Sequence, residues 1–201
     1  MIKTILGVTV IGMITLSAFT FKGDTYKVDT KASSMEWTGK KLTGEHNGTI
    51  LLSSGEIEVT KDVVTGGKFE IDMTTIEDKD LQDPSWKSKL EGHLKSADWF
   101  DTQKFQKATF VITSVTPIKD AKDGGYTHTV KGNLTIKDKT NEISFDAVVK
   151  MADGKVACVG QATLDRSKYD IKYGSKTFFP EIGDKLIYDE FTVKFNVVAT
   201  K

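Results

Sequence analysis

The sequence predicts an all-β protein, built as an antiparallel sandwich or barrel of about eight short strands. Two observations carry this prediction. Apolar and polar residues alternate with a period of two over most of the chain, as in strands that bury one face. Polar turn sequences such as KDGG and ADG separate these segments at short, regular spacing. One central segment breaks the period and predicts the one clear helix.

The alternation is clearest in the second half of the chain. Residues 126–136 and 141–151 each place apolar side chains on one face, and the KDKT sequence between them predicts a hairpin. A turn at ADGK (152–155) leads into the strand VACVGQATL, and EFTVKFNVV forms the last strand. HNG (46–48) and TGG (65–67) are interpreted as turns upstream. The remaining predicted strands are SMEWTGKKL, NGTILLSS, GEIEV, KFEIDMTTI and ATFVITSV.

The segment DPSWKSKLEGHLKSADWF (83–100) predicts a short helix near residues 84–96. Asp83 can cap this helix, and a proline then occupies the first helical position. Gly92 weakens the helix or ends it early. Residues spaced four apart share one helical face: Trp86, Leu90 and Leu94.

The first 22 residues are typical of a secretory signal peptide. Lys3 precedes a long uncharged apolar run, and polar residues then return. Small residues suit cleavage near Ser17 or Thr20. We therefore expect a periplasmic or secreted protein in which residues 23–201 form one domain. The alternative is an uncleaved membrane anchor.

Charge and cysteine content exclude several classes of protein. The 28 basic residues balance 28 acidic residues, so no strong field recruits nucleic acid, and we expect no nucleic-acid partner. Cys158 is the only cysteine, which rules out an intrachain disulfide. Its apolar strand predicts a core position rather than a reactive thiol.

Catalytic and metal chemistry receive little support. The three histidines, His46, His93 and His128, have no metal-ligand spacing, so we expect neither a metal nor a cofactor. His46 lies in a sequence that predicts an exposed turn, and His128 lies on an apolar strand face. His93 is the candidate general base of an enzyme, but the sequence offers it no nucleophile partner.

Arg166 is the single arginine of the chain. Its planar guanidinium can bind a carboxylate or phosphate in a geometry that lysine cannot copy. It therefore either anchors a ligand head group or forms a structural pair with Asp165 at one end of a barrel.

Five motifs, in order, resemble the YceI-like family of bacterial proteins. They are YKVDTKASSMEW, HLKSADWFD, GNLTIKDKT, LDRSKYDI and IGD (182–184). The resemblance covers about Tyr26 to Ala199. Two departures stand out: Ala32 replaces a common histidine, and residues 90–92 replace a frequent Arg-Asp pair.

The resemblance implies a lipocalin-like antiparallel β-barrel of eight strands with a helix near one end. It also implies an exported protein that binds a polyisoprenoid, an isoprenoid quinone or a similar lipid inside the barrel, with no catalytic residues. An eight-stranded barrel has room for side chains or for one slender ligand. The expected partner is therefore a long-chain isoprenoid or other lipid.

HLKSADWFD (93–101) is then interpreted as the cover of the barrel. His93, together with Asp98 or Asp101, is expected to fix the geometry of the helix and the following loop by hydrogen bonds. Small inward residues favour an open interior over a solid core: Gly132, Ala147, Cys158, Gly160 and Ala162. The cavity-facing residues of the cover are Leu94, Trp99 and Phe100.

The candidate ligand-binding residues combine the cover with inward strand positions. Phe178 is included because Phe178 and the adjacent Phe179 lie at a rim or in a homodimer contact. Two other functions stay open: an enzyme that uses His93 on a lipid-like substrate, and a filled barrel whose surface binds a partner. The candidates are Trp37, Phe69, Ile71, His93, Leu94, Trp99, Phe100, Phe110, Ile112, Val130, Leu134, Phe145, Val149, Arg166 and Phe178.

Overall fold

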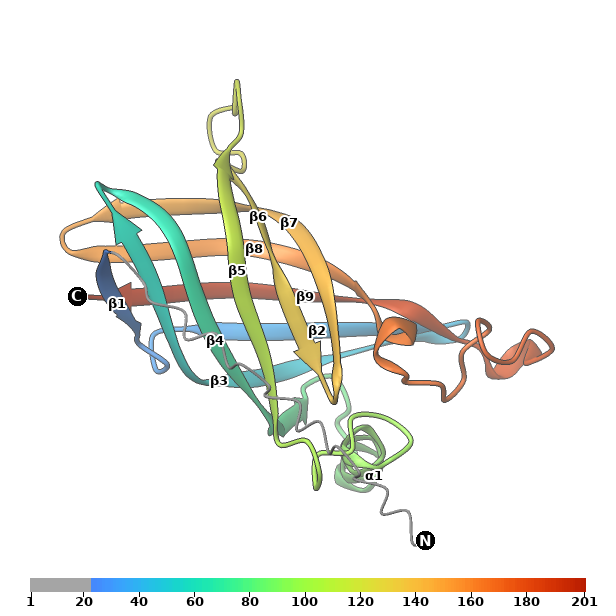
Figure 1. Ribbon diagram of the computed structural model, residues 1–201. Helices are drawn as coiled ribbons and strands as arrows, with labels where there is room; N and C mark the ends of the chain where they lie inside the picture. The colour runs from blue at the N-terminus through green and yellow to red at the C-terminus, as the bar shows by residue number, and fades with distance from the viewer. Residues whose placement is uncertain (1–22) are drawn as a thin grey trace, which may run out of the picture.

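The alternating segments form one continuous antiparallel sheet that closes on itself (Figure 1). The computed structural model describes residues 23–201, so the expected signal peptide lies outside the described residues. Within residues 23–201, no helix is long and apolar enough to cross a membrane. The strands are β1 (Asp24–Val28), β2 (Ser34–Lys41), β3 (Gly44–Thr60), β4 (Val63–Asp78), β5 (Lys107–Pro117), β6 (His128–Ile136), β7 (Lys139–Ala152), β8 (Lys155–Asp165) and β9 (Ile187–Thr200).

Eight of these strands, β2 to β9, close the barrel. Neighbouring strands follow the order β2-β9-β8-β7-β6-β5-β4, and β3 pairs with both β4 and β2. The short strand β1 was not expected. Like β2, it lies between β3 and β9, where Tyr26 pairs with Ile57 and Val28 pairs with Ala199. The lipocalin-like, eight-stranded antiparallel barrel is therefore confirmed.

Strand β3 corrects the sequence-based strand pattern. NGTILLSS and GEIEV belong to one strand of 17 residues, whose register to β4 shifts at three places. HNG and TGG are not turns, because both lie inside strands. A Cβ atom at Gly48 would collide with the Glu77 carbonyl and the Trp37 ring, so glycine there permits close packing. His46 consequently lies half-buried in β3 rather than in an exposed turn.

Tight turns join the longest strands. Lys61 and Asp62 between β3 and β4 have φ values of 51° and 60°, and Asp153 and Gly154 between β7 and β8 have 51° and 69°. Positive φ at both central residues matches the right-handed twist of a hairpin. The predicted hairpin between β6 and β7 and the predicted ADGK turn are both confirmed.

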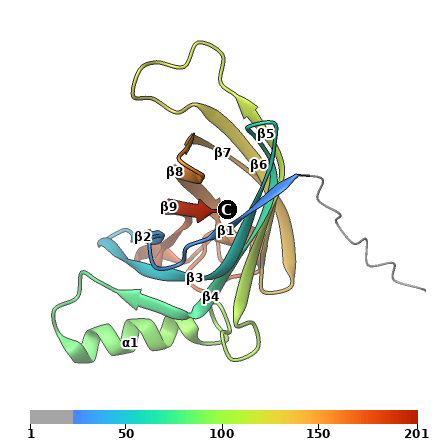
Figure 2. The same cartoon turned by 90° about the vertical axis from the view of Figure 1, so that its left-hand side faces the viewer.

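The predicted helix is confirmed as α1 (Pro84–Lys95), which lies at one end of the barrel beside β3 and β4 (Figure 2). The Asp83 carboxylate accepts hydrogen bonds from the backbone N–H groups of Ser85 (2.8 Å) and Trp86 (3.1 Å). The helix continues past Gly92, so of the two alternatives for this residue an early end is excluded. Trp86 does not share the packed face, because 60% of its surface is exposed.

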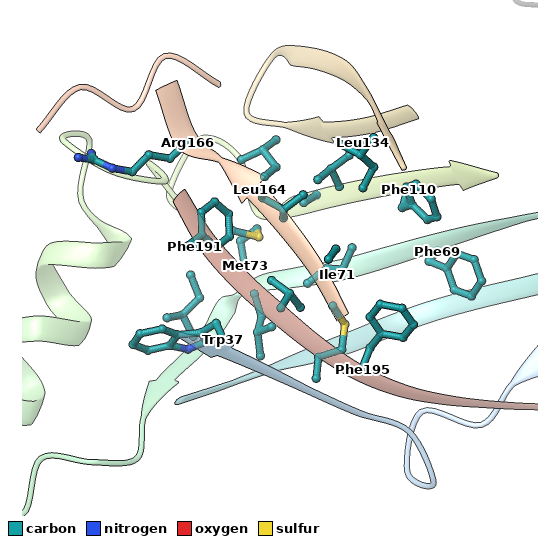
Figure 3. Close-up of a pocket in the computed structure, with 18 of the residues that line it drawn as sticks. Trp37, Phe69, Ile71, Met73, Phe110, Leu134, Leu164, Arg166, Phe191 and Phe195 are labelled. Carbon is teal, nitrogen blue, oxygen red and sulfur yellow. The ribbon is translucent and has the colours of Figure 1, made fainter. Parts of the chain in front are cut away.

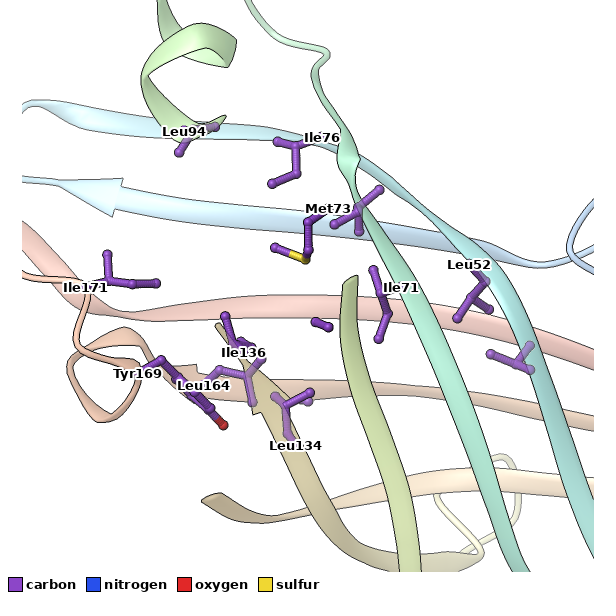
Figure 4. Packing of buried hydrophobic residues seen from close by; sticks show 14 residues of the cluster. Leu52, Ile71, Met73, Ile76, Leu94, Leu134, Ile136, Leu164, Tyr169 and Ile171 are labelled. Atoms are coloured by element: carbon purple, nitrogen blue, oxygen red, sulfur yellow. The ribbon is translucent and has the colours of Figure 1, made fainter. Parts of the chain in front are cut away.

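Buried apolar side chains form two clusters inside the barrel. The larger cluster lies toward α1 and joins Leu94 of the helix to Met73 and Ile76 of β4 (Figure 4). A smaller cluster lies at the other end, where β1 meets the β3–β4 turn. Its buried members are Tyr26, Ile57, Val59, Val64, Val156 and Ala199.

Candidate ligand-binding cavity

A cavity of about 460 Å³ lies inside the barrel. Inward side chains from every strand between β2 and β9 line it (Figure 3). Its lining extends from Lys40 and Lys41 at the end of β2 to Ile57 and Val156 in the smaller cluster, so the cavity runs along the barrel. The volume lies within the range of about 300–1,000 Å³ that is usual for small-molecule sites.

The structure places all but one of the candidate residues on the cavity wall. The exception is Phe178, which is half-buried in the segment after β8 and has the Lys172 ammonium 5.3 Å from its ring centroid. The neighbouring Phe179 is 51% exposed. That these wall residues bind a ligand stays a prediction. Those on the wall are Trp37, Phe69, Ile71, His93, Leu94, Trp99, Phe100, Phe110, Ile112, Val130, Leu134, Phe145, Val149 and Arg166.

Sequence reasoning missed a large part of the wall. The apolar face of β9 was expected to point into the barrel, but its residues were not included among the candidate ligand-binding residues. Tyr173 lies in an irregular segment, where no periodicity could have found it, and Tyr188 lies in β9 but out of phase with the other wall residues of that strand. The missed wall residues include Met35, Met73, Leu164, Phe191, Val193, Phe195 and Val197.

The small inward residues play different parts from those expected. Cys158 and Ala162 do line the cavity. A Cβ atom at Gly132 would meet the Phe110 ring at 2.5 Å, and one at Gly160 would meet the Phe195 ring at 2.7 Å. These two glycines therefore make room for aromatic rings rather than leaving open space. Burial raises the pKa of the Cys158 thiol to about 11, which keeps the thiol neutral.

The HLKSADWFD stretch forms a cover that backbone hydrogen bonds hold together. The Phe100 N–H donates to the Leu94 carbonyl (3.2 Å), and the Asp101 N–H donates to the Ser96 carbonyl (2.8 Å). The expected hydrogen bonds of His93 are made by its backbone: the His93 carbonyl accepts from the Ser96 N–H (3.0 Å) and the Ser96 hydroxyl (2.7 Å), whereas its ring nitrogens have no hydrogen-bond partner among the described residues. The His93 ring instead packs edge-on against Tyr173, with centroids 4.4 Å apart.

Arg166 is buried at the cover end of the barrel, as Figure 3 shows, with 2% of its side chain exposed. Nη1 donates to the carbonyls of Ile171 (3.3 Å) and Tyr173 (2.6 Å). Nε donates to the carbonyl of Tyr188 (3.2 Å), and Nη2 to that of Ile187 (3.0 Å). Four of its N–H donors are therefore committed to backbone carbonyls, two in the segment that precedes β9 and two at the start of β9.

The ion-pair partner of Arg166 also differs from the expected one. Asp189, not Asp165, lies beside the guanidinium, with Nη2 and Oδ1 3.2 Å apart. Asp165 instead accepts hydrogen bonds from the backbone and hydroxyl of Ser167. Burial lowers the pKa of Arg166, and the Asp189 charge opposes that shift. The structural interpretation of Arg166 fits this geometry better than a head-group anchor does.

Two tryptophans of the cavity wall have a buried indole N–H group without a hydrogen-bond partner among the described residues. Nε1 of Trp37 and Nε1 of Trp99 are buried and have no acceptor within the described part of the chain. Both residues line the cavity. A buried donor without an acceptor is costly, so a ligand oxygen near these indoles would satisfy groups that the protein leaves unpaired.

Solved structures share this fold at low sequence identity. BcnA of Burkholderia cenocepacia matches with a TM-score of 0.67 and 23% identity, covering 86% of this chain and 99% of BcnA. A polyisoprenoid-binding domain from Saccharophagus degradans, implicated in plant cell wall breakdown, matches with a TM-score of 0.61 and 14% identity, covering 87% and 97%. These likenesses show the fold.

Sequence comparison shows the family. A UPF0312 protein from Staphylococcus aureus strain USA300 is 37% identical over 90 residues, which cover 41% of this chain. The match spans about half of that relative, 47% of its length. The model of the YceI-like domain matches residues 26–199, nearly the whole described chain. The protein therefore belongs to the YceI-like family.

Proposed function

We propose that this protein is a non-enzymatic carrier that holds a long apolar chain, such as a polyisoprenoid or an isoprenoid quinone, inside its barrel. The observation that carries the proposal is the elongated cavity of about 460 Å³, whose wall is almost wholly apolar. The Saccharophagus degradans relative, described as a polyisoprenoid-binding domain, supports the same ligand class.

The apolar wall supplies enough binding energy without special polar chemistry. Burying one methylene group contributes about 0.8 kcal/mol, so about ten buried carbons contribute roughly 8 kcal/mol before ordering costs. The wall offers aromatic rings along its length, from Trp37 near the cover to Phe69 and Phe110 deeper in the barrel (Figure 3). A slender unsaturated chain fits such a wall.

The unpaired indoles suggest how the chain is oriented. Trp99 belongs to the cover, and Trp37 lies at the same end of the cavity. An oxygen at the head of the ligand would accept from Nε1 of either indole, while the apolar tail would run toward the smaller cluster. A ligand with a carbonyl, hydroxyl or phosphate head group satisfies this arrangement.

The surroundings of His93 support a carrier rather than an enzyme. A general base needs a positioned proton donor and is usually oriented by a third group. Within residues 23–201, the His93 ring touches the Tyr173 and Trp99 rings, and neither a hydroxyl nor a carboxylate hydrogen bonds to it.

Export to the periplasm or the cell exterior is part of the same proposal and depends on the expected signal peptide.

Titration with a fluorescent prenyl probe tests the proposal. Trp99→Asp should weaken binding at least tenfold, because it places a polar group on the cavity wall and removes an indole donor. Trp86→Asp is the matched control, since Trp86 is exposed on α1, and it should bind as the wild type does. Equal binding by both variants, with unchanged circular dichroism, would remove Trp99 and the cover from the site.

A further inference from the structure

A cluster of three metal-ligating side chains lies where β4 ends, at the polar edge of the cavity, where His46 belongs to the wall. His46 of β3, Asp78 at the end of β4 and Asp80 just beyond it each place one ligand atom within 4.8 Å of the others. His46 Nδ1 and Asp80 Oδ2 are 3.0 Å apart. Two segments far apart in sequence are thus brought together at the end of the barrel where α1 lies.

Asp78 is the unusual member of this cluster. Its side chain is fully buried, with an exposed fraction of 0%. Oδ1 accepts a hydrogen bond from the Leu81 N–H (2.8 Å), whereas Oδ2 is buried and has no hydrogen-bond partner. A buried carboxylate without a full set of partners is strongly unfavourable unless a proton or a cation neutralises it.

The surrounding cations do not neutralise Asp78. The nearby lysines Lys79 and Lys87 form ion pairs with Glu77 instead, at 2.8 Å and 2.9 Å. The backbone N–H of Asp78 donates to Glu91 of α1 (2.9 Å), which brings a further carboxylate toward the cluster. Among the ion pairs of residues 23–201, none gives Asp78 a cationic partner. The cluster therefore combines an excess of negative charge with an imidazole.

We propose that His46, Asp78 and Asp80 form a binding site for one divalent metal ion, with Zn²⁺ as the best match to these ligands. Zinc takes imidazole nitrogen and carboxylate oxygen at about 2.0–2.2 Å, and three protein ligands leave a fourth position open. Tetrahedral ligands at those bond lengths lie about 3.3 Å apart, so separations up to 4.8 Å close with small side-chain rotations.

Outer contacts already hold two of the ligands in place. The Asn47 N–H donates to Asp80 Oδ1 (2.8 Å), and the Leu81 N–H donates to Asp78 Oδ1 (2.8 Å). Such contacts orient metal ligands before the ion arrives. Because His46 also lines the cavity, a bound ion would fasten the segment that leads into α1 to β3 beside the cavity. The site does not depend on lipid binding.

Zinc titration of the tag-free, metal-stripped protein tests the site, with isothermal calorimetry for affinity and elemental analysis for stoichiometry. We expect one Zn²⁺ per chain and a rise in Tm, because the ion binds only the folded state. His46→Gln and Asp80→Asn should each weaken zinc binding at least tenfold. Asp78→Asn should do the same if it folds, and the other two variants decide the test if it does not.

His128→Gln is the matched control, because His128 is also a half-buried strand histidine and hydrogen bonds to Thr127 (2.8 Å). Its zinc affinity should equal that of the wild type. Two results would overturn the proposal. One is a wild type that binds no zinc at about 100 µM, as expected if Asp78 simply keeps a proton. The other is zinc binding that persists undiminished in His46→Gln and Asp80→Asn.

Discussion

Arg166 lies over the face of Trp99, with its guanidinium carbon 4.8 Å from the centroid of the indole ring. The arginine also bonds to four backbone carbonyls of residues 171–188, and the indole belongs to the cover that follows α1. One side chain thus joins the two segments that close the same end of the barrel. This explains why the chain uses its single arginine here, since lysine has no planar face to stack.

Replacing Arg166 with lysine should therefore destabilise the protein by about 3 kcal/mol or more. A lysine keeps the charge but cannot reach four carbonyls or stack on Trp99, which leaves buried acceptors unpaired. Urea unfolding followed by circular dichroism measures the change in the free energy of unfolding. Lys168→Arg, an exposed substitution two residues away, should stay within about 0.5 kcal/mol of the wild type. Equal stability of Arg166→Lys and Lys168→Arg would refute the structural role.

Filling the cavity should block the ligand without unfolding the barrel. Ala162→Phe puts a ring into the cavity, and we expect prenyl-probe affinity to fall at least tenfold. Overpacking a filled core costs about 1–3 kcal/mol, and the empty volume here should keep the loss at the low end of that range. Val159→Phe on the outer face of β8, where Val159 is 46% exposed, should bind normally. Unchanged affinity in Ala162→Phe would mean that the chain does not enter this part of the barrel.

Gly132→Ala should be destabilising, by about 1–3 kcal/mol. The new Cβ atom would lie 2.5 Å from the Phe110 ring and 2.5 Å from the Val111 carbonyl oxygen, and the backbone contact cannot be relieved by a rotamer change. Gly92→Ala in α1 meets nothing within 4 Å and should instead stabilise the protein by about 1 kcal/mol. Denaturant unfolding of both variants checks the opposite signs, and a neutral Gly132→Ala would contradict the packing of Phe110.

Cys158 should be unreactive in the folded protein and should make stability depend on alkaline pH. The pKa of the unfolded thiol is about 8.5, whereas burial raises the pKa of the folded thiol to about 11. Raising the pH above 9 therefore ionises the unfolded state first and lowers the free energy of unfolding. Urea unfolding at pH 8 and about pH 10.5 should show a larger loss for the wild type than for Cys158→Ala. Fast labelling of the native thiol at pH 8 by a disulfide reagent would show that the sulfur is not buried.

Local patterns predicted the barrel and its helix because those patterns are set by local chemistry. Period-two alternation identified β6, β7 and β9, and the cap at Asp83 identified the start of α1. Local patterns wrongly placed Gly48 in a turn. Glycine is required there because the Glu77 carbonyl of another strand lies too close for a side chain. Contacts between residues that are distant in sequence cannot be recognised from a local sequence pattern.

Period-two alternation predicted many residues of the cavity wall, whereas it could not predict which polar side chains pair with each other. Asp189 rather than Asp165 pairs with Arg166, because β9 brings Asp189 beside the end of β8. Phe178 was included because it is an aromatic residue beside Phe179, and it lies off the cavity wall. The closeness of His46 to Asp78 and Asp80 depends on the pairing of β3 with β4, which no spacing along the chain encodes.

Native mass spectrometry of the protein purified from a bacterial host, followed by organic extraction, tests the central claim most directly. A hollow barrel that carries a lipid predicts an adduct of several hundred daltons that extracts as a prenyl or similar long apolar chain. A clean apo mass that stays apo after incubation with prenyl lipids would contradict the carrier function. The barrel interior would then be a packing feature, and the function would have to lie on the surface.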